Sequence, residues 1–382
     1  MKILHLMLAC FYIDNYSYQE NLLPKYHKAA GHDVEIVASL FTFDENGNGK
    51  WLDKSSAYRN EHDIPVTRLA FKKGKAARLL RRYVGLADEL ERIAPDVIFI
   101  HGAQFSDIDR VVEYCKRHPA VTVYVDNHSD FSNSAKNWVS KNVLHKIVWR
   151  RCAKKIEPYT TKFYGVLPAR VDFLREVYKL PADKIELLVM GADDEAVAAA
   201  DTTESKAAIR QRYGIADDDF LIMYGGKTDN YKKQVMLLMD AVNALNNPKV
   251  KLIVFGSVIP ELKDEIDRRC SDRVQYIGWV LAADSYQYFA AADLAVFPGR
   301  HSVFWEQVVA QGVPLLVKRW DGTTHVDCGG NVKFLTQDSA DEIKAALEDI
   351  LSGDTYAVMK AAADRAQDGF MYSRIAERSI AE

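Results

Sequence analysis

Short apolar runs alternate with longer amphipathic segments along the whole chain. Runs of four to eight apolar residues are typical of buried strands, and apolar residues at three- and four-residue spacing between them are typical of helices. This alternation predicts strand, helix, strand units that form parallel sheets. The expected strands cover residues 2–9, 34–37, 96–101, 121–125, 220–224, 252–256, 274–278, 294–297 and 313–317. The clearest expected helices cover residues 18–31, 302–311, 340–351, 355–366 and 372–381.

Two stretches depart from this alternation. Residues 44–60 are polar and contain glycine, so we expect an irregular segment there. Residues 192–203 are rich in Ala, Asp and Thr, and we expect them to form an exposed connector. Because 382 residues are too many for one ordinary hydrophobic core, the chain is expected to form two α/β domains.

The stretch 293–314 predicts the first candidate site. A short strand ends at Pro298 and Gly299, and Ser302 is placed to cap a helix that stops at Gly312. In an open parallel sheet, the loop between such a strand and helix lies at the carboxyl ends of the strands, where these folds bind ligands. The free N–H groups and the positive dipole end of the helix suit an anion such as a diphosphate.

A second candidate site follows the strand expected at 220–224. Gly225 and Gly226 allow the backbone to approach a ligand, and Lys227 and Lys232 place two cations five residues apart in the same loop. Two such cations can hold a diphosphate from both sides. The alternative is an exposed basic turn with no ligand.

His128 lies just past the end of the strand expected at 121–125. That position is suited to chemistry, although a lone histidine is as often a structural one. Asp126 and Asp130 are close enough in sequence to act as its partners.

These segments resemble the donor site of retaining glycosyltransferases of family 4. The sequence Gly312-Val313-Pro314 and its preceding helix match the family segment in which two Glu, separated by seven residues, precede Gly-x-Pro. Counting back from the glycine places the second acid at Gln307, with Glu306 beside it. The first acid is absent, and Gly299-Arg300-His301 stand there instead. The glycine-rich first loop of the family is replaced by residues 11–14.

The resemblance implies a role for each candidate residue. His128 would face the transferred sugar, the two lysines would bind the diphosphate, and Glu306 or Gln307 would hold sugar or ribose hydroxyls. The residues expected to be catalytic are His128, Lys227, Lys232 and Glu306. The residues expected to bind the donor are Gly226, Trp279, Val280, Ser302, Val303 and Gln307, with Trp279 and Val280 holding the nucleobase through backbone groups.

The resemblance also implies a fold and a reaction. The fold would be the B-type glycosyltransferase architecture, in which two Rossmann-like domains, here 1–190 and 191–370, face each other across a cleft. Residues 371–382 would form a helix that crosses back to the first domain. The reaction would move a sugar from a nucleoside diphosphate sugar, UDP rather than GDP, to an acceptor hydroxyl with retention of configuration. The alternatives are an inverting transferase on the same fold and a catalytically idle nucleotide-sugar-binding scaffold protein.

Charge is divided unevenly along the chain. Residues 1–170 hold 26 Lys and Arg against 19 Asp and Glu, which leaves 24 against 34 for residues 171–382. Basic segments with interspersed apolar residues occur at 72–82 and 136–155. Each predicts contact with an anionic membrane surface or, for 72–82 equally well, a solvated helix face. A glycan or lipid-linked acceptor in cell-surface polysaccharide or glycolipid assembly fits this basic first half, and nucleic acid is not an expected partner.

Five cysteines without a CxxC motif predict neither a disulfide framework nor a zinc site. The expected location is therefore the cytoplasm, with peripheral contact to the inner face of the cell membrane. The Asp-x-Asp sequences at 107–109 and 217–219 read as a helix start and a surface turn. No metal ion or other cofactor is expected.

Overall fold

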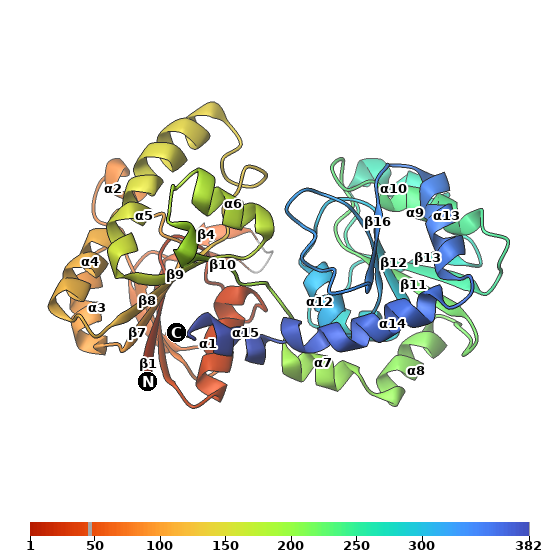
Figure 1. Ribbon diagram of the computed structural model, residues 1–382, viewed down its shortest axis with the longest axis horizontal. Coiled ribbons are helices and arrows are strands. Elements are labelled where there is room, and N and C mark those ends of the chain that lie inside the picture. Colours follow the sequence, from red (N-terminus) through yellow and green to blue (C-terminus); the bar gives the residue numbers. More distant parts are fainter. Residues whose placement is uncertain (45–47, 382) are drawn as a thin grey trace. The chain divides into compact units, whose positions relative to one another are not determined.

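The computed structural model describes residues 1–44 and 48–381 and divides the chain into two compact units. Unit 1 comprises Met1–Val189 and Ile375–Glu382, and unit 2 comprises Met190–Arg374. Unit 1 is therefore built from two separate parts of the sequence. In Figure 1 the last described residues, in dark blue, lie beside the red helix α1 of unit 1.

Unit 1 is built on an eight-stranded sheet with the order β10-β9-β8-β7-β1-β2-β6-β5. Neighbouring strands are parallel except β5 and β6, which are antiparallel at the edge. The strands are β1 (Lys2–Met7), β2 (Asp33–Ser39), β5 (Ser56–Arg59), β6 (Pro65–Leu69), β7 (Val97–His101), β8 (Thr122–Asn127), β9 (Thr160–Gly165) and β10 (Ile185–Leu187), and β3 (Phe41–Phe43) and β4 (Gly49–Trp51) form a separate hairpin. The central strands are buried on both faces, as parallel strands between helix layers must be.

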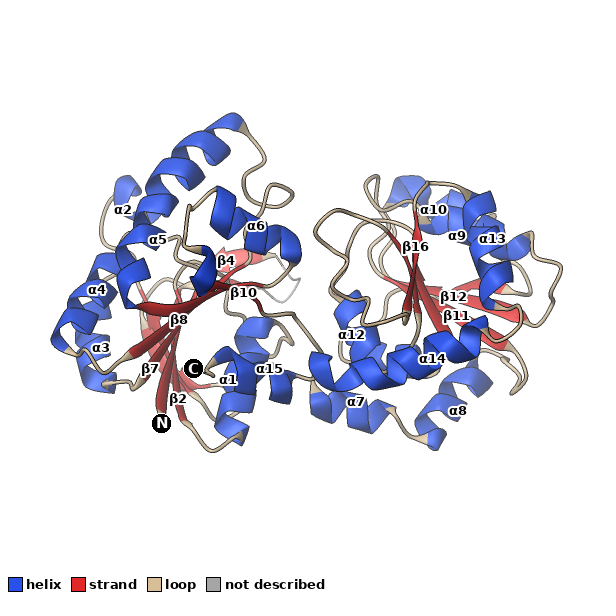
Figure 2. Cartoon of the chain, in the orientation of Figure 1, coloured by secondary structure: helices blue, strands red, loops and turns tan. Residues whose placement is uncertain are grey.

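Helices cover both faces of this sheet (Figure 2). Helices α3 and α4 pack side by side on one face, and α1 and α15 lie on the other. The helices are α1 (Gln19–Ala29), α2 (Lys75–Leu79), α3 (Leu86–Ile93), α4 (Ile108–Arg117), the π-helix η1 (Ser140–Trp149), α5 (Arg150–Ile156), η2 (Glu157–Tyr159), α6 (Pro168–Glu176), η3 (Ala182–Lys184) and α15 (Tyr372–Ser379). The tyrosine hydroxyls of Tyr124 and Tyr164 donate to carbonyls of Ile380 and Arg378, which fixes the final segment on unit 1.

Unit 2 is built on a six-stranded parallel sheet with the order β13-β12-β11-β14-β15-β16. Its strands are β11 (Phe220–Gly225), β12 (Val250–Phe255), β13 (Val274–Tyr276), β14 (Leu294–Phe297), β15 (Leu315–Lys318) and β16 (Val332–Leu335). Its helices are α7 (Asp194–Ala200), α8 (Thr203–Arg212), α9 (Val235–Asn243), α10 (Pro260–Asp267), α11 (Ser285–Ala290), α12 (Phe304–Ala310), α13 (Ala340–Ile350), α14 (Thr355–Ala366) and η4 (Gln367–Phe370). They also cover both faces of the sheet, as Figure 2 shows.

Each sheet has one point where the strand order reverses. In unit 1 the chain leaves β1 toward β2 and β6, then returns to place β7 on the other side of β1. In unit 2 it leaves β11 toward β12 and β13, then returns to place β14 beside β11. Open α/β sheets bind ligands at the carboxyl ends of the strands at such switch points. The fold therefore directs attention to the loops after β1 and β7, and to those after β11 and β14.

Two expectations about local structure were wrong. Residues 192–203 are not an exposed connector, because α7 buries Val197 and Ala200 and packs against α11. The segment expected to be irregular at 44–60 contains β4 and β5, although residues 45–47 lie outside the described part of the chain. The basic stretch 72–82 contains the short helix α2, none of whose residues is buried, and Arg81 just beyond the helix has a positive φ of 53°.

Candidate functional site

A cavity of about 630 Å³ opens at the switch point of unit 1. It is lined by the loop after β1, by Gly102 and Gln104 after β7, and by His128 and Ser129 after β8. Tyr18 and Glu20 contribute from the start of α1. The wall combines hydroxyl, carboxyl and imidazole groups with aromatic rings, a composition suited to a polar organic ligand.

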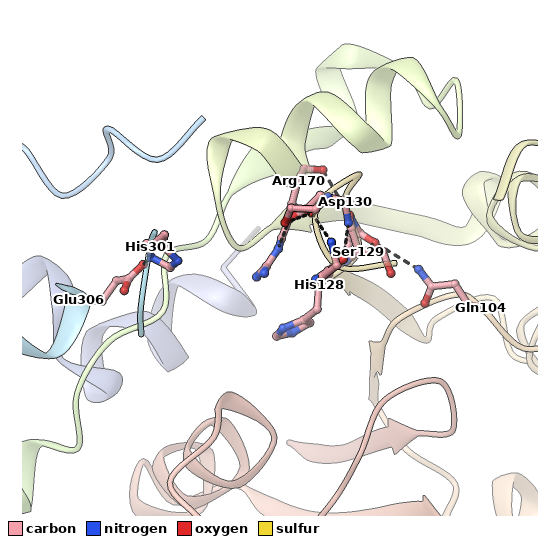
Figure 3. A network of polar contacts seen from close by, with 10 residues as sticks. Gln104, His128, Ser129, Asp130, Arg170, His301 and Glu306 are labelled. Atoms are coloured by element: carbon pink, nitrogen blue, oxygen red, sulfur yellow. Dashed lines mark hydrogen bonds and ion pairs between the residues drawn. The ribbon is translucent and has the colours of Figure 1, made fainter. Parts of the chain in front are cut away.

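His128 is 28% exposed and lies in the wall of this cavity, where Figure 3 shows its ring directed away from the β8 loop. Its Nε2 lies 3.3 Å from Oδ2 of the buried Asp126 and 4.0 Å from a carboxylate oxygen of Glu20. Burial opposes protonation of the ring, but these carboxylates outweigh it and raise the pKa of His128. Asp130, the second expected partner, instead forms an ion pair with Arg170 at 3.2 Å.

Asp126 is the end of a chain of buried imidazoles that the sequence did not reveal. His101 Nδ1 lies 2.9 Å from Asp126 Oδ2, and His101 Nε2 lies 2.9 Å from His5 Nδ1. His5 Nε2 lies 3.0 Å from His27 Nδ1, and His27 Nε2 lies 3.0 Å from the carbonyl oxygen of Ala376. The chain connects the final segment of unit 1 to the wall of the cavity.

Burial keeps two of these rings neutral. It lowers the pKa of His5 well below its usual value and lowers that of His27 to about 4. At the other end of the chain, burial alone would raise the pKa of Asp126, but the neighbouring His101 and His128 outweigh it and hold that pKa far below the usual range. His27 Nε2 also lies 3.0 Å from the hydroxyl oxygen of Ser379.

In unit 2 the loop after β11 is held tightly against the neighbouring loop. The Gly226 N–H donates to the Phe255 carbonyl, and the Thr228 N–H donates to the Ser257 carbonyl at 2.8 Å. Gly226 has a φ of 146°, and a Cβ on Gly256 would lie 2.0 Å from the carbonyl oxygen of Gly226. Glycine is required at this close approach of two backbones.

The expected lysines of this loop lie in different surroundings. Lys227 is 62% exposed and lies 3.5 Å from Asp229. Lys232 lines a small hollow of about 10 Å³ together with Gly226, Arg300 and Ser302. Burial and the neighbouring Arg300 lower the pKa of Lys232, although Asp229 opposes this. The hollow is too small to hold a diphosphate. A bound anion would therefore lie at its opening, between the side chains of Lys232 and Arg300.

Helix α12 begins later than expected. Its N-cap is Val303, which is 53% exposed, and the Phe304 N–H donates to Ser302 Oγ at 3.4 Å. Gly312 ends the helix as expected, with a φ of 66°. The helix is only seven residues long, so its dipole adds less to anion binding than the nearby cations do.

Both candidates for the acid of α12 are buried. Gln307 is 6% exposed and donates to Ser285 Oγ and Gln311 Oε1. Glu306 is fully buried, and its Oε1 accepts hydrogen bonds from His301 Nε2 and His325 Nε2, both at 2.8 Å. A direct contact of either residue with a sugar hydroxyl would therefore require neighbouring side chains to move.

Trp279 and Val280 lie in the loop after β13, with Trp279 67% exposed. The backbone of this loop is tied to the loop after β12, because the Gly256 N–H donates to the Gly278 carbonyl at 2.7 Å. The role of the pair in holding a nucleobase stays a prediction.

Two groups of described residues bring three metal-ligand atoms within 4.8 Å of one another. They are His101, Asp126 and His128, and His301, Glu306 and His325. Ligand atoms of a tetrahedral zinc site lie about 3.3 Å apart, since each bond measures about 2.0–2.1 Å. Both contacts to Glu306 are hydrogen bonds of 2.8 Å, shorter than the spacing of zinc ligands. In the other group, His101 and His128 lie 2.9 Å and 3.3 Å from Asp126, and neither nitrogen has a hydrogen-bond partner among the described residues.

A family model described as Glycosyl transferases group 1 matches residues 219–353. These residues form a Glycosyl transferases group 1 domain. The domain contains β11 to β16 and both loops at the switch point of unit 2. The expected Lys227, Lys232, Glu306 and Gln307 all lie inside it.

A curated relative, an uncharacterized glycosyltransferase of Methanocaldococcus jannaschii, is 23% identical over 159 residues. The match covers 39% of this chain and 40% of the relative, so the similarity spans about two fifths of each protein. The name of this relative agrees with the family matched by residues 219–353.

Solved structures match over almost the whole chain. Alr3699/HepE of Anabaena in complex with UDP has a TM-score of 0.67, with 18% identity over 99% of this chain and 98% of that one. WaaG, a glycosyltransferase involved in lipopolysaccharide biosynthesis, has a TM-score of 0.62, with 13% identity over all of both chains. The predicted fold class is thereby confirmed as α/β, with two Rossmann-like domains of the B type.

No helix in the described ranges 1–44 and 48–381 has both the length and the apolar composition needed to cross a bilayer.

Proposed function

We propose that this protein is a glycosyltransferase that moves a sugar from a nucleoside diphosphate sugar, UDP rather than GDP, to an acceptor hydroxyl. The observation that carries the proposal is that two cations, Lys232 and Arg300, line the same hollow at the switch point of the family domain. UDP is favoured because HepE, a neighbour in fold, is a complex with UDP. Lys227, in the same loop, adds a third cation at the surface.

The chemical problem is the departure of the diphosphate. The bond between the anomeric carbon and the diphosphate oxygen breaks, and negative charge develops on that oxygen. Lys227, Lys232 and Arg300 stabilise this charge, so the chain itself supplies the positive charge that a metal ion supplies elsewhere. The acceptor oxygen bonds to the anomeric carbon. With retention it attacks from the side of the leaving group, and its proton passes to the departing phosphate oxygen.

The acceptor is proposed to bind in the cavity of unit 1. His128, in the wall of this cavity, is proposed to contact the transferred sugar. The raised pKa of His128 favours its charged form, which suits donation of a hydrogen bond to a sugar oxygen. The acceptor class is a glycan or a lipid-linked intermediate of cell-surface polysaccharide or glycolipid assembly. An inverting reaction remains the second candidate, because His128 beside Asp126 has the pairing of a general base. The anomeric configuration of the product, read by NMR, separates the two.

The binding step is tested by thermal unfolding of the protein with UDP, GDP, ADP, CMP or dTDP and no added metal. A ligand at about 100 times its dissociation constant adds about 2.7 kcal/mol of stability. Stabilisation by UDP alone supports the proposal. Stabilisation by another diphosphate would correct the donor class, and stabilisation by none would refute the donor site.

Catalysis is tested with the double variant Lys227→Ala/Lys232→Ala. It should lose at least 99% of turnover while its melting temperature stays within about 2 °C, since Lys227 is largely exposed and Lys232 lies at the edge of the hollow. The matched control is Lys344→Ala/Lys360→Ala, which removes two partly exposed helix lysines of unit 2. Equal rates for the two double variants would show that the loop does not hold the diphosphate.

A membrane surface is proposed as a second partner, through the exposed side of η1. Val139, Val143 and Ile147 are spaced by four residues and are 56%, 37% and 62% exposed, with Trp138 at 71% beside them. Segment 136–155 carries seven Lys and Arg against no Asp or Glu. Exposed apolar side chains in a segment whose charged residues are all cations suit an anionic lipid surface, on the inner face of the cell membrane if the protein is cytoplasmic.

This contact is tested by co-sedimentation with vesicles that contain 30% phosphatidylserine, at low and high salt. Wild-type protein should bind at low salt and dissociate at high salt. Trp138→Ser/Ile147→Ser should reduce binding about tenfold, while Val358→Ser, an equally exposed apolar residue in unit 2, should not. Equal binding by the two variants would show that η1 does not contact the membrane.

A further inference from the structure

A fully buried carboxylate lies between two imidazoles in unit 2. Glu306 on α12 accepts a hydrogen bond from His301, in the loop after β14, and from His325, in the loop after β15. Figure 3 shows the His301 ring beside the Glu306 carboxylate. Burial alone would raise the pKa of Glu306, but the two imidazoles outweigh it and lower the pKa to about 2. Glu306 is therefore anionic at neutral pH and fixes the orientation of both rings.

The two rings differ in the surroundings of their second nitrogen. His325 is 1% exposed, and its Nδ1 is buried without a partner among the described residues. His301 is 15% exposed, and its Nδ1 makes no hydrogen bond with the described residues and is not sealed from solvent. In a neutral ring, the single hydrogen is on the Nε2 that donates to Glu306, so Nδ1 carries a lone pair. His301 thus presents an oriented acceptor nitrogen to solvent.

The position of His301 relates this acceptor to the proposed donor site. Its sequence neighbours Arg300 and Ser302 line the hollow with Lys232. The Trp305 ring packs edge-to-face against the imidazole, with centroids 5.0 Å apart, and restricts its rotation. A lone pair repels the oxygens of a diphosphate but accepts a hydrogen from a hydroxyl. Two parts of a nucleoside diphosphate sugar adjoin the diphosphate and carry hydroxyls, the ribose and the transferred sugar, and only the transferred sugar is absent from UDP.

We propose that His301 Nδ1 accepts a hydrogen bond from a hydroxyl of the transferred sugar. Glu306 is a positioning residue that selects the tautomer of His301, and His325 is the second donor that keeps Glu306 anionic. The inference rests on the proposed function, because it needs a diphosphate held by Lys232 and Arg300. It assigns sugar recognition in unit 2 to a histidine instead of to the buried acid.

The test separates binding of the sugar from binding of the nucleotide. Wild-type protein and His301→Ala are titrated calorimetrically at pH 8 with UDP and with UDP-glucose, UDP-galactose and UDP-N-acetylglucosamine. The quantity compared is the ratio of the dissociation constant of UDP to that of the tightest UDP-sugar. His301→Ala should lower this ratio fivefold to tenfold and leave the dissociation constant of UDP within twofold.

Three further variants guard against a loss of folding. His301→Gln keeps a donor toward Glu306 and an outward acceptor, so it should restore at least half of the wild-type ratio. Glu306→Gln should lower the ratio about threefold, because a neutral amide no longer selects the tautomer. His325→Gln keeps a donor toward Glu306 but loses the packing of the sealed ring, so it should lower the melting temperature and leave the ratio unchanged.

An unchanged ratio in His301→Ala, or equal losses for UDP and UDP-sugar, would overturn the inference. Absence of UDP binding by wild-type protein would refute the proposed donor site itself, and the inference with it. Binding of UDP with the expected change in the ratio would support both.

Discussion

His27 should make unit 1 sensitive to mild acid. Its ring lies 1% exposed between His5 and the carbonyl of Ala376, and burial lowers its pKa from the ordinary value of about 6.5 to about 4. Between these values the unfolded chain binds a proton that the folded chain does not. Stability therefore rises with pH, and it is lost as pH falls from about 6.5 toward 4.

The magnitude follows from this shift. At pH 5.0, protonation of His27 in the unfolded chain lowers the free energy of unfolding by about 2 kcal/mol. Near pH 7.5 this effect is close to zero. His27→Gln removes the titrating ring and keeps a donor toward Ala376. The variant's free energy of unfolding should be about 1–2 kcal/mol below that of wild type at pH 7.5. Between pH 7.5 and pH 5.0, however, it should fall by about 2 kcal/mol less than that of wild type.

The assay must report on unit 1 alone, since two units need not unfold together. Native-state hydrogen exchange of the amides of β1 and β7, corrected for intrinsic rates, gives the opening free energy at each pH. His118→Gln, a partly exposed histidine at the C-cap of α4, is the matched control. Parallel pH dependence in wild type and His27→Gln would refute the reasoning, because the acid sensitivity would then come from other groups.

Two further changes test the close packing around the candidate sites. Gly256→Ala should destabilise unit 2 by about 2–4 kcal/mol and weaken nucleotide binding, because a Cβ would collide with the carbonyl of Gly226. Thermal unfolding with and without UDP measures both effects. Arg68→Met should destabilise unit 1 by about 3–5 kcal/mol, because it leaves Asp14 and three backbone carbonyls without their buried guanidinium. Arg68→Lys should recover less than half of this loss, and full recovery would show that charge alone matters.

The alternation of strands and helices could be predicted from the sequence because parallel strands buried on both faces are continuous apolar runs. The strand at 294–297 and the helix at 355–366 were predicted to the residue. Residues 192–203 were misjudged because alanine is abundant both in connectors and in short helices. Only the packing of Val197 against neighbouring helices distinguishes the two.

The candidate sites were predictable only where a motif lies within one loop. Lys227, Lys232 and Ser302 follow strand ends and could be found from spacing, whereas His325 meets Glu306 from 19 residues away along the chain. His5 and His101 carry a different signal in the sequence. Each interrupts a buried apolar strand, and a buried polar side chain needs a partner.

The two-part construction of unit 1 has a consequence for synthesis on the ribosome. The segment from Ile375 onward, which supplies the carbonyl partner of His27, is translated after every residue of unit 2. Unit 2 is continuous in sequence and can complete its core as soon as it emerges. The first 189 residues must wait, with α1 uncovered, until the far end of the chain arrives. The part of the protein that is made first is therefore the part that is finished last.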